Sequence, residues 1–337
     1  MIETKEIEYK PKDFSSDQEV KWCPGCGDYA ILKAVQKAMP LIGKKREDIV
    51  FVSGIGCSSR FPYYMDTFGF HGIHGRAPAL ASGVKLANPD LSVWQITGDG
   101  DALAIGGNHF IHAIRRNMGL NILLFNNRIY GLTKGQFSPT TNLGQKTKSS
   151  PQGVIDNPFH PGELILGAQG TFFARTVDIN PRHLTDIAVD AEKHAGTAVI
   201  EILQNCVIFN DKVFSDYTSK ENKHDALLYA EHGKPMIFGK ESDKGLRLNG
   251  LEIEVVTIGE NGVTEDDLIV HDAHVVNPTL HFMLVRLEFP MVLGVIRSVE
   301  QEPFEERLTK QVAEVEAKSP FKTMDDLLQS GETWEIK

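Results

Sequence analysis

The sequence predicts an α/β fold built on a doubly wound parallel sheet. Between residues 28 and 203, apolar runs of strand length alternate with segments whose apolar residues recur at helical spacing, and several runs end in a loop that contains glycine. This alternation is typical of parallel strands joined by helices that cover both faces of the sheet. Ligands bind at the carboxyl ends of the strands in such sheets, so the loops that follow the strands are expected to converge on one site.

The expected elements can be placed in chain order. A helix begins near Asp28, because the apolar residues between Ala30 and Met39 recur at helical spacing. Strands are then expected at residues 49–56, 91–100, 121–127, 172–177 and 197–203, with helices at residues 79–87, 104–118 and 184–195. The segments "GIGCSS", "GDGDA" and "NNRIYG" each follow a strand and are therefore the loops expected to meet. The sequence contains no internal repeat.

Three regions are expected along the chain. Residues 1–18 are polar and form an N-terminal arm, residues 19–210 form the sheet domain, and residues 211–337 form an irregular C-terminal extension. Within the extension, "MIFGK", "LRLNG" and "IEVVTI" suit short strands, and "VEQEPFEERLTKQVAEVEAKSP" suits an acidic helix. Two interpretations of the extension remain open at this point: it packs on the core, or it embraces a partner subunit.

The composition predicts a globular protein of the cytoplasm. The chain has 337 residues, of which 41% are hydrophobic and 24% charged, and this is enough to bury a substantial core. The N-terminal "MIETKEIEYKPKDF" has no apolar stretch, so no signal or transit peptide is expected. No run approaches the roughly twenty apolar residues of a membrane span. A net charge of −10 argues against general nucleic-acid binding, which needs clustered Lys and Arg.

Residues 98–127, "GDGDALAIGGNHFIHAIRRNMGLNILLFNN", indicate a site for a metal ion and a diphosphate. Asp99 ends one expected strand and Asn127 ends the next, so the two side chains are expected side by side at one edge of the sheet. A hard divalent cation suits a carboxylate oxygen, an amide oxygen and a main-chain carbonyl, with diphosphate oxygens completing its octahedron. Gly98 and Gly100 let the backbone approach phosphates closely. The competing interpretation is a plain strand–helix–strand unit with a glycine turn.

This segment resembles the diphosphate-binding motif of thiamine-diphosphate enzymes, in which GDG is followed, after a helix, by NN. The resemblance implies a magnesium ion held by Asp99, the Asn127 side chain and the Ile129 carbonyl. The residues that would line the diphosphate are Gly100, Asp101, Gly131 and Leu132. A rival interpretation takes "GIGCSS" as a dinucleotide-binding loop, but this segment lacks the third glycine of that motif.

The chain contains four cysteines, and their spacing favours metal or redox chemistry. Cys23 and Cys26 form a C-x-x-C pair, whereas Cys57 and Cys206 each follow an expected strand. A disulfide framework is not expected in a reducing compartment. Four thiolates suit either a zinc ion or a cubane iron–sulfur cluster; the wide spacing argues against a local zinc knuckle without excluding zinc. Cys57 or Cys206, taken alone, could also be a small buried residue.

The ordered motifs of the chain together resemble the β subunit of 2-oxoacid:ferredoxin oxidoreductases. The resemblance covers about residues 20 to 230, in "WCPGCG", "GIGCSSR", "HGIHGR", "ASGVKLANP", "GDGDALAIGGNH", "NNRIYGLTKGQFSPTT" and the late Cys206. It implies a sheet of the thiamine-diphosphate-binding type and a [4Fe–4S] cluster held by Cys23, Cys26, Cys57 and Cys206. It also implies an α subunit that supplies the carboxylate facing the aminopyrimidine ring. The chain is then active only as one half of an αβ heterodimer, which is expected to pair again as a dimer of heterodimers.

Within this family, "GCSSRFPYY" and "NNRIYGLTKGQFSPTT" are most similar to the 2-oxoglutarate type. The resemblance implies thiamine-dependent oxidative decarboxylation of 2-oxoglutarate with coenzyme A, giving succinyl-CoA, CO2 and reduced ferredoxin in a reaction that is reversible in principle. Three alternatives stay open. The substrate could be pyruvate or a broad range of 2-oxoacids, the enzyme could be a thiamine-dependent decarboxylase or synthase with a structural zinc site, or the chain could be a non-enzymatic electron-transfer or scaffold subunit.

Roles can be expected for single residues, from the resemblance for the thiamine loop and from position and chemistry for Arg60 and Lys134. The residues expected to line the thiamine are Ile55, Gly56, Cys57 and Ser58, unless this loop is a simple tight turn. His74 is expected to contact the diphosphate or the reacting carboxylate, whereas His71 is expected to be structural. Arg60 is expected to point to the active-site cavity and bind the distal carboxylate of 2-oxoglutarate, because a guanidinium suits a carboxylate; the alternative is a surface ion pair. Lys134 is expected to meet the phosphates of coenzyme A or the acidic face of ferredoxin.

Overall fold

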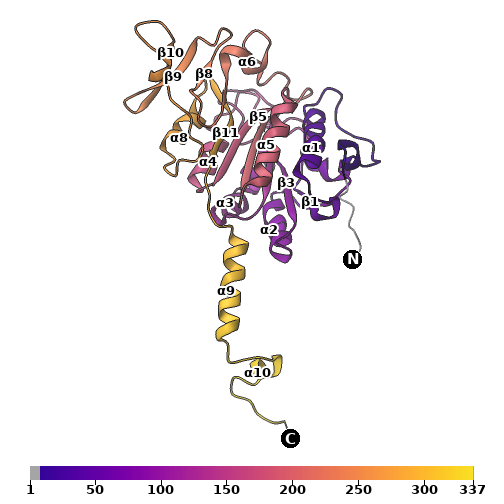
Figure 1. Cartoon of the computed structure of the whole chain (residues 1–337). Coiled ribbons are helices and arrows are strands. Elements are labelled where there is room, and N and C mark those ends of the chain that lie inside the picture. The colour runs from indigo at the N-terminus through magenta and orange to yellow at the C-terminus, as the bar shows by residue number, and fades with distance from the viewer. Residues whose placement is uncertain (1–7, 337) are drawn as a thin grey trace.

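An eight-stranded sheet runs through the centre of the molecule in the computed structural model, which describes residues 8–336 (Figure 1). Its strand order is β2-β1-β3-β4-β6-β5-β11-β7. The strands are β1 Ile49–Ser53, β2 Phe68–His71, β3 Ser92–Gly98, β4 Asn121–Asn126, β5 Phe172–Val177, β6 Ala198–Leu203, β7 Leu227–Ala230 and β11 Met291–Ser298. All neighbouring pairs are parallel except β5 and β11. The predicted α/β fold with a largely parallel sheet is confirmed.

The central strands are buried on both faces, which explains why their sequences are apolar without alternation. Along β1, Val50 belongs to a core cluster that includes Phe110. The next residue, Phe51, belongs to a second cluster with Ile31 and Leu184. Successive side chains of a strand point to opposite faces, so the sheet separates two cores. The strands therefore carry apolar residues on both faces, and the polar residues among them, such as Gln95 and Glu201, are buried as well.

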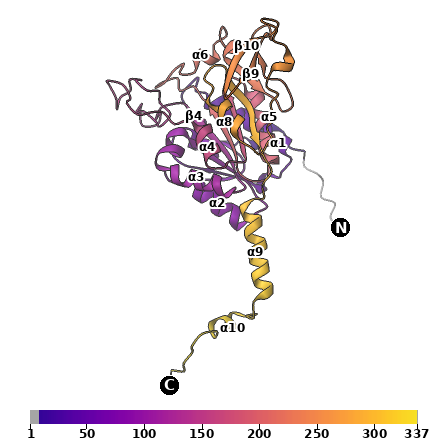
Figure 2. The ribbon, with the colours of Figure 1, turned by 90° about the vertical axis from the view of Figure 1, so that its left-hand side faces the viewer.

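Helices cover both faces of the sheet (Figure 1, Figure 2). On one face α1 (Asp28–Ile42) packs against α5 (Pro181–Lys193), and the Thr185 hydroxyl donates to the Ala34 carbonyl across 3.0 Å. On the other face lie α2 (Ala77–Ala87), α3 (Gly107–Arg116) and α4 (Pro161–Gly167). Among the described residues, no helix combines the length and the apolar character that crossing a bilayer requires.

The chain beyond residue 210 continues the central sheet. β7 and β11 form its last two strands, and β11 pairs with β5 as well as with β7. The boundary predicted at residue 210 therefore falls within the body that the sheet builds, and the extension is less irregular than predicted. The three short strands predicted in this region are present as β8 (Ile237–Phe238), β9 (Lys244–Asn249) and β10 (Glu252–Thr257), which form a separate antiparallel sheet. Helix α8 spans Thr279–Arg286.

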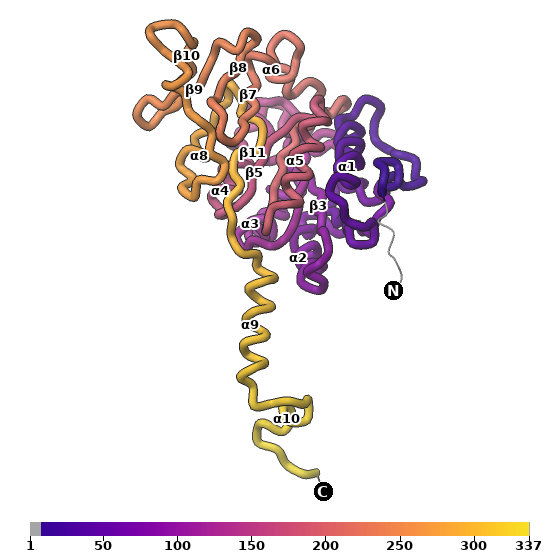
Figure 3. Tube along the Cα trace, viewed as in Figure 1, coloured from indigo at the N-terminus to yellow at the C-terminus, as the bar shows by residue number. Residues whose placement is uncertain are grey.

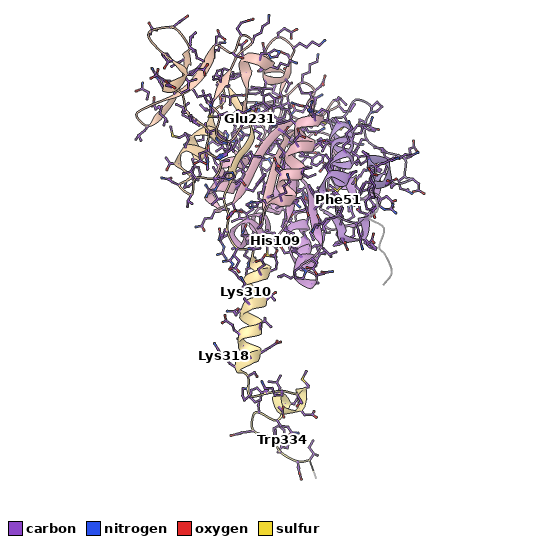
Figure 4. All side chains as sticks on the ribbon, in the orientation of Figure 1. Phe51, His109, Glu231, Lys310, Lys318 and Trp334 are labelled. Atoms are coloured by element: carbon purple, nitrogen blue, oxygen red, sulfur yellow. The ribbon has the colours of Figure 1, made fainter. Side chains whose placement is uncertain are left out.

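The last part of the extension projects away from this body (Figure 3). It consists of α9 (Phe304–Lys318) and α10 (Met324–Leu328). Figure 4 shows the side chains of Lys310, Lys318 and Trp334 along the projection, clear of the sheet. Residues 311–318 are all exposed, whereas Glu305 at the start of α9 is buried. Packing on the core thus ends within the first turns of α9.

The N-terminal arm lies against the body where the structure describes it. Its residues 1–7 fall outside the described residues. Phe14 ends a short 3-10 helix, Pro11–Phe14, and its side chain is fully buried. Ser15 forms an isolated antiparallel bridge with Met65. The described part of the arm is therefore anchored by the buried Phe14 ring and this bridge, together with hydrogen bonds from the Ser16 hydroxyl to the Tyr63 carbonyl and from Arg46 to the Asp13 carbonyl.

Candidate active site

A cavity of about 640 Å³ opens at the carboxyl ends of β1, β3 and β4. Its volume lies in the range of cofactor and small-molecule sites. All the residues that the sequence predicts to contact thiamine diphosphate or magnesium line it: Ile55, Gly56, Cys57, Ser58, His74, Asp99, Gly100, Asp101, Asn127, Ile129, Gly131 and Leu132. The loops after three parallel strands converge here, as the order of the elements predicts.

Asp99, just after β3, is held by two hydroxyl groups. Asp99 is only 2% exposed. Its Oδ2 atom accepts hydrogen bonds from Ser138 Oγ at 2.5 Å and from Thr140 Oγ1 at 2.6 Å. Burial raises the pKa of Asp99, and the two hydroxyls oppose that rise. A divalent cation would likewise stabilise the buried carboxylate, so this side chain fits a hard metal ion such as Mg²⁺.

A chain of polar contacts supports this carboxylate from the side of the sheet. Thr140 Oγ1 also lies 2.9 Å from Asn126 Oδ1, and Asn126 Nδ2 donates to Glu201 Oε1 at 2.8 Å. Glu201 in turn forms a buried ion pair with Arg175 at 2.7 Å. The two asparagines of the NN motif therefore have different tasks. Asn126 supports Asp99 through Thr140, and only the second asparagine lines the cavity.

Asn127, that second asparagine, is oriented by its neighbours. Its Oδ1 accepts a hydrogen bond from the Ile129 amide at 3.1 Å, and its Nδ2 donates to Gln204 Oε1 at 2.8 Å. The Gln204 Nε2 atom lies 3.3 Å from Cys26 Sγ. One glutamine side chain therefore connects a predicted magnesium ligand to a predicted cluster ligand. The sequence did not predict this role for Gln204, which only the fold brings to Asn127.

Asp101 is committed to contacts within the protein. Its Oδ1 accepts hydrogen bonds from the main-chain amides of Ile55 at 3.1 Å and Gly75 at 2.8 Å, and it lies 2.7 Å from His74 Nδ1. Its Oδ2 accepts a hydrogen bond from the Thr97 hydroxyl at 2.7 Å. The carboxylate thus joins the two loops that wall the cavity and fixes His74. The sequence predicted Asp101 at the diphosphate; Asp101 lines the cavity, these contacts give it a positioning role, and its contact with the diphosphate stays a prediction.

Tyr130 is a cavity residue that the sequence analysis did not select. Its hydroxyl donates to the Gly100 carbonyl at 2.8 Å, and its ring packs edge-on against His74 with the centroids 6.3 Å apart. A Cβ atom on Gly100 would lie 2.3 Å from Tyr130 Cε1. The glycine after Asp99 is therefore required by this tyrosine. A signal was present in the sequence, because Tyr130 lies in the "NNRIYG" loop itself.

The four predicted cluster cysteines lie in segments that meet beside the cavity, and all are free thiols. Cys57 lines the cavity. A Cβ atom on Gly131 would lie 3.7 Å from Cys57 Sγ and 3.5 Å from Cys206 Sγ, so both sulfurs flank this glycine. The Cys26 amide donates to the Cys23 carbonyl at 3.0 Å, which folds the C-x-x-C pair into a turn. The thiols thus gather on the cofactor side of the sheet.

The electrostatics of these thiols favour binding to a cationic group. Burial raises the pKa of Cys57 to about 12 and also raises the pKa of Cys26, and the charge of Asp28 adds to both shifts. Thiolates here need a metal to remain deprotonated. Among residues 8–336, no three His, Cys, Asp or Glu side chains are close enough to share one metal ion. Four thiolates suit either a zinc ion or a cubane iron–sulfur cluster.

Asp28 lines the same cavity and is a candidate that sequence reasoning missed. It is 1% exposed, and within the described part of the chain neither carboxylate oxygen has a hydrogen-bond partner. Burial raises its pKa to about 7. The sequence suggested only an acid in the first turn of a helix. The start of α1 faces the cavity because the preceding cysteine turn leads the chain there, and no local pattern reveals this.

Arg60 lies outside the main cavity. It lines a neighbouring cavity of about 650 Å³ together with Lys21 and His71. The two cavities share Ile55, Gly56 and Leu132. The sequence places Arg60 toward the active-site cavity; the structure places it, within the 3-10 helix Ser58–Tyr64, on the wall of this adjoining cavity, and its contact with the substrate stays a prediction. Lys134 is exposed and lines neither cavity.

Comparison with known proteins agrees with this geometry. Residues 54–202 match the family model described as "Thiamine pyrophosphate enzyme, C-terminal TPP binding domain", a span that contains the three cavity loops. The 2-oxoglutarate oxidoreductase subunit KorB of Mycobacterium tuberculosis is 48% identical over 341 residues, covering 99% of this chain and 91% of that one. The chain belongs to the family of 2-oxoacid:ferredoxin oxidoreductase β subunits.

Other members of the family match to different extents. The 2-oxoacid:ferredoxin oxidoreductase subunit beta of Saccharolobus solfataricus is 46% identical over 201 residues, which are 59% of this chain and 66% of that one. A solved structure, the 2-oxoglutarate:ferredoxin oxidoreductase from Magnetococcus marinus with 2-oxoglutarate, coenzyme A and succinyl-CoA bound, matches with a TM-score of 0.78 at 28% identity. That match covers 98% of both chains. The chain is thus an oxidoreductase subunit with a thiamine-diphosphate-binding domain.

Proposed function

We propose that this chain is the catalytic β subunit of an enzyme that converts 2-oxoglutarate and coenzyme A into succinyl-CoA and CO2 while reducing ferredoxin. The C1–C2 bond of the oxoacid breaks, the coenzyme A sulfur bonds to C2 as its thiol proton is released, and two electrons leave one at a time. One observation carries the proposal. Gly131 lines the cofactor cavity and lies against the sulfurs of Cys57 and Cys206, so the cofactor and the cluster would share a wall.

The cavity fits thiamine diphosphate with Mg²⁺. Asp99, Asn127 and the Ile129 carbonyl supply oxygen ligands of the kind that Mg²⁺ prefers. When bound, thiamine diphosphate takes up the electron pair that CO2 leaves behind. The chain's own residues orient the bound group. Since Asp101 engages His74 Nδ1, Nε2 is the ring nitrogen left to exchange a proton in the cavity.

The cysteine set fits a [4Fe–4S] cluster. Cys23, Cys26, Cys57 and Cys206 are the four ligands we propose. Gln204 adds a hydrogen bond at 3.3 Å to Cys26 Sγ, of the kind that tunes iron–sulfur clusters. Held by these cysteines beside the cofactor cavity, the cluster would allow the removal of single electrons.

The rim of the cavity supports a partner subunit. Apolar side chains with more than a third of their surface exposed gather near it, on β2, on the loop that follows β2 and at the end of the short helix Asp101–Ile105, which lies against that loop: Phe68, Phe70, Ile73 and Ile105. Exposed apolar patches of this kind mark protein interfaces. All four positions of β2 are exposed, so this edge strand is uncovered in the chain alone. We propose that an α subunit covers this rim and completes the site, and that two αβ units assemble.

The proposed substrate rests on Arg60 and on the relatives. Arg60 lies in a cavity that shares three residues with the cofactor cavity, so a dicarboxylate could extend from one to the other. A guanidinium suits the distal carboxylate. The names of the relatives from M. tuberculosis and M. marinus include 2-oxoglutarate. Coenzyme A and ferredoxin are the proposed co-substrates, since the M. marinus enzyme carries the first and is named for the second.

The test is to co-produce the chain with its α subunit under anaerobic conditions. We expect CoA-dependent reduction of a one-electron acceptor with 2-oxoglutarate, together with iron, sulfide and thiamine diphosphate in the purified complex. Asp99→Ala should lose thiamine binding, whereas Asp90→Ala, at an exposed site, should keep it. Arg60→Ala should weaken turnover of 2-oxoglutarate more than that of pyruvate.

Each competing interpretation has its own outcome in this experiment. Zinc without iron would favour a decarboxylase or synthase, and absence of thiamine binding would favour a scaffold subunit. Faster turnover of pyruvate would change the substrate but not the chemistry. Full activity of the isolated chain would contradict the need for an α subunit.

A further inference from the structure

A short segment beside the cysteines carries an unusual charge. Between Arg128 and Ser150 the sequence has four Lys or Arg residues and no Asp or Glu, in a chain whose net charge is −10. Lys134, Lys146 and Lys148 are exposed. Within residues 8–336 none of these three lysines forms an ion pair with a carboxylate. The segment is therefore a local positive surface on an acidic protein.

This segment packs directly on the turn that carries Cys206. Lys148 Nζ lies 5.3 Å from the centroid of the Phe209 ring, three residues after the cysteine. A Cβ atom on Gly135 would touch the same ring at 3.1 Å. Gln145 Nε2 donates to Asn210 Oδ1 at 2.9 Å. The lysines are thus fixed against the predicted cluster site by packing and by a hydrogen bond between side chains.

The centre of this surface is apolar and adjoins the C-x-x-C pair. Ile208 is 58% exposed, and Val207 lies against Gly25, because a Cβ atom there would be 3.6 Å from Val207 Cγ1. Cys23 is exposed. Lys212 adds a further exposed cation at the edge of the turn, beside Asp211, whose carboxylate accepts a hydrogen bond from Asn205 at 2.9 Å. We call Val207, Ile208, Phe209, Lys134, Lys146, Lys148 and Lys212 the lysine surface.

We propose that the lysine surface is the docking site of the electron acceptor, a small ferredoxin with an acidic face. This inference rests on the proposed function, because it needs a cluster at the four cysteines. Electron transfer needs the acceptor close to the cluster, and the surface contains the turn that holds one predicted ligand. Charge complementarity speeds the encounter of such partners, whereas the small apolar centre keeps the complex short-lived.

The geometry favours a protein over the phosphates of coenzyme A. The three lysines of the segment line neither the cofactor cavity nor the neighbouring cavity with Arg60. They stand on an open surface around exposed apolar side chains, which suits a broad contact. A nucleotide would instead be expected in a cavity where cations converge.

The test uses the αβ holoenzyme and measures kcat/KM for ferredoxin and, separately, for methyl viologen, a small cationic acceptor. Lys146→Gln combined with Lys148→Gln should lower kcat/KM for ferredoxin at least about fivefold at low ionic strength, with the gap closing as salt is added. The single variant Lys146→Glu should act in the same direction without touching Phe209. Turnover with methyl viologen, KM for coenzyme A and the electron paramagnetic resonance signal of the reduced cluster should not change.

Lys193→Glu is the matched control. This lysine is 71% exposed at the end of α5, and its substitution changes the net charge by two, as the double variant and Lys146→Glu each do. The docking site would be overturned if the lysine-surface variants lost no more kcat/KM for ferredoxin than the control does. It would also be overturned if these variants lost kcat/KM equally for ferredoxin and methyl viologen, or if only their KM for coenzyme A rose. A wild-type complex without a cluster signal would instead refute the proposed function, so the two failures are distinguishable.

Discussion

Asp101 Oδ1 lies 2.7 Å from His74 Nδ1 and at the same time accepts two main-chain hydrogen bonds. One carboxylate thereby couples the loop after β1 to the loop that carries His74. Both loops wall the cofactor cavity. The shape of the cavity consequently depends on Asp101, whose two carboxylate oxygens are engaged by other groups of the protein.

The first prediction concerns Asp101→Ala. The change leaves the Ile55 and Gly75 amides and the Thr97 hydroxyl without their acceptor. Each buried donor left unpaired costs about 1–3 kcal/mol, so we expect a clear fall in the thermal midpoint and weaker thiamine diphosphate binding by calorimetry. Asp101→Asn keeps one acceptor oxygen, so its thermal midpoint and its affinity for thiamine diphosphate should fall less than those of Asp101→Ala. Equal stability of wild type and Asp101→Ala would show that the carboxylate does not hold the loops.

The second prediction concerns Gly100→Ala. The new Cβ atom would lie 2.3 Å from the Tyr130 ring, so the ring must move and its hydrogen bond to the Gly100 carbonyl should be lost. We expect thiamine diphosphate to bind at least about tenfold more weakly, since overpacking a fitted site typically costs 1–3 kcal/mol. Gly107→Ala is the control, because a Cβ atom there meets nothing within 4 Å. Similar binding by both variants would contradict the steric argument.

The third prediction concerns Gln204→Leu. The substitution removes the hydrogen bond to Cys26 Sγ and leaves Asn127 Nδ2 without its acceptor. A donor near a cluster sulfur stabilises the more negative reduced state, so the reduction potential should fall. A titration followed by electron paramagnetic resonance measures the shift. Gln36→Leu, which loses a bond to the Tyr64 carbonyl on the arm side of α1, should leave the potential unchanged. An unshifted potential in Gln204→Leu would exclude a tuning role.

Sequence patterns were sufficient for the central strands and for the loops that follow them. The runs that became β3 and β4 carry apolar residues on both faces because helices bury both, and parallel strands place Asp99 and Asn127 at one edge. Three strands of the sheet were missed. The edge strand β2 has only four residues, all exposed, so no buried apolar run marks it. β7 and β11 lie far along the chain beyond charged segments, and nothing local shows that "MVLGVIRS" returns to pair with β5.

The missed site residues share a cause. Gln204 and Asp28 are ordinary in their local sequence and acquire a role only because β6 and the cysteine turn end beside the cavity. Arg60 shows a different limit. It follows the cysteine loop closely in sequence, and the 3-10 helix Ser58–Tyr64 places it in the cavity that adjoins the cofactor cavity. Spacing along the chain locates a loop at a site, but it does not fix which side of the loop a given side chain faces.

The fourth prediction concerns the projecting C-terminal segment. Met324, Leu328 and Trp334 are 68%, 69% and 83% exposed, so removing residues 319–337 should hardly change the thermal midpoint of the isolated chain. We expect the αβ assembly to weaken, because exposed apolar side chains of this density indicate a contact with a partner. Light scattering of the complex measures this. Leu251→Ser, at a 90% exposed site on the turn before β10, should leave assembly intact. Unchanged assembly after truncation would refute the contact.

The fifth prediction concerns the pH dependence of stability through His194. Burial lowers its pKa from 6.5 to about 4, and its Nε2 lies 2.8 Å from the Thr171 hydroxyl. Below about pH 6.5, His194 binds a proton in the unfolded chain but stays neutral in the folded chain. The free energy of unfolding therefore falls as the pH is lowered from about 6.5 to about 4. His194→Gln should lose less stability over this window in urea titrations. His224→Gln, at an exposed site, should follow the wild type, and parallel curves for all three proteins would contradict the argument.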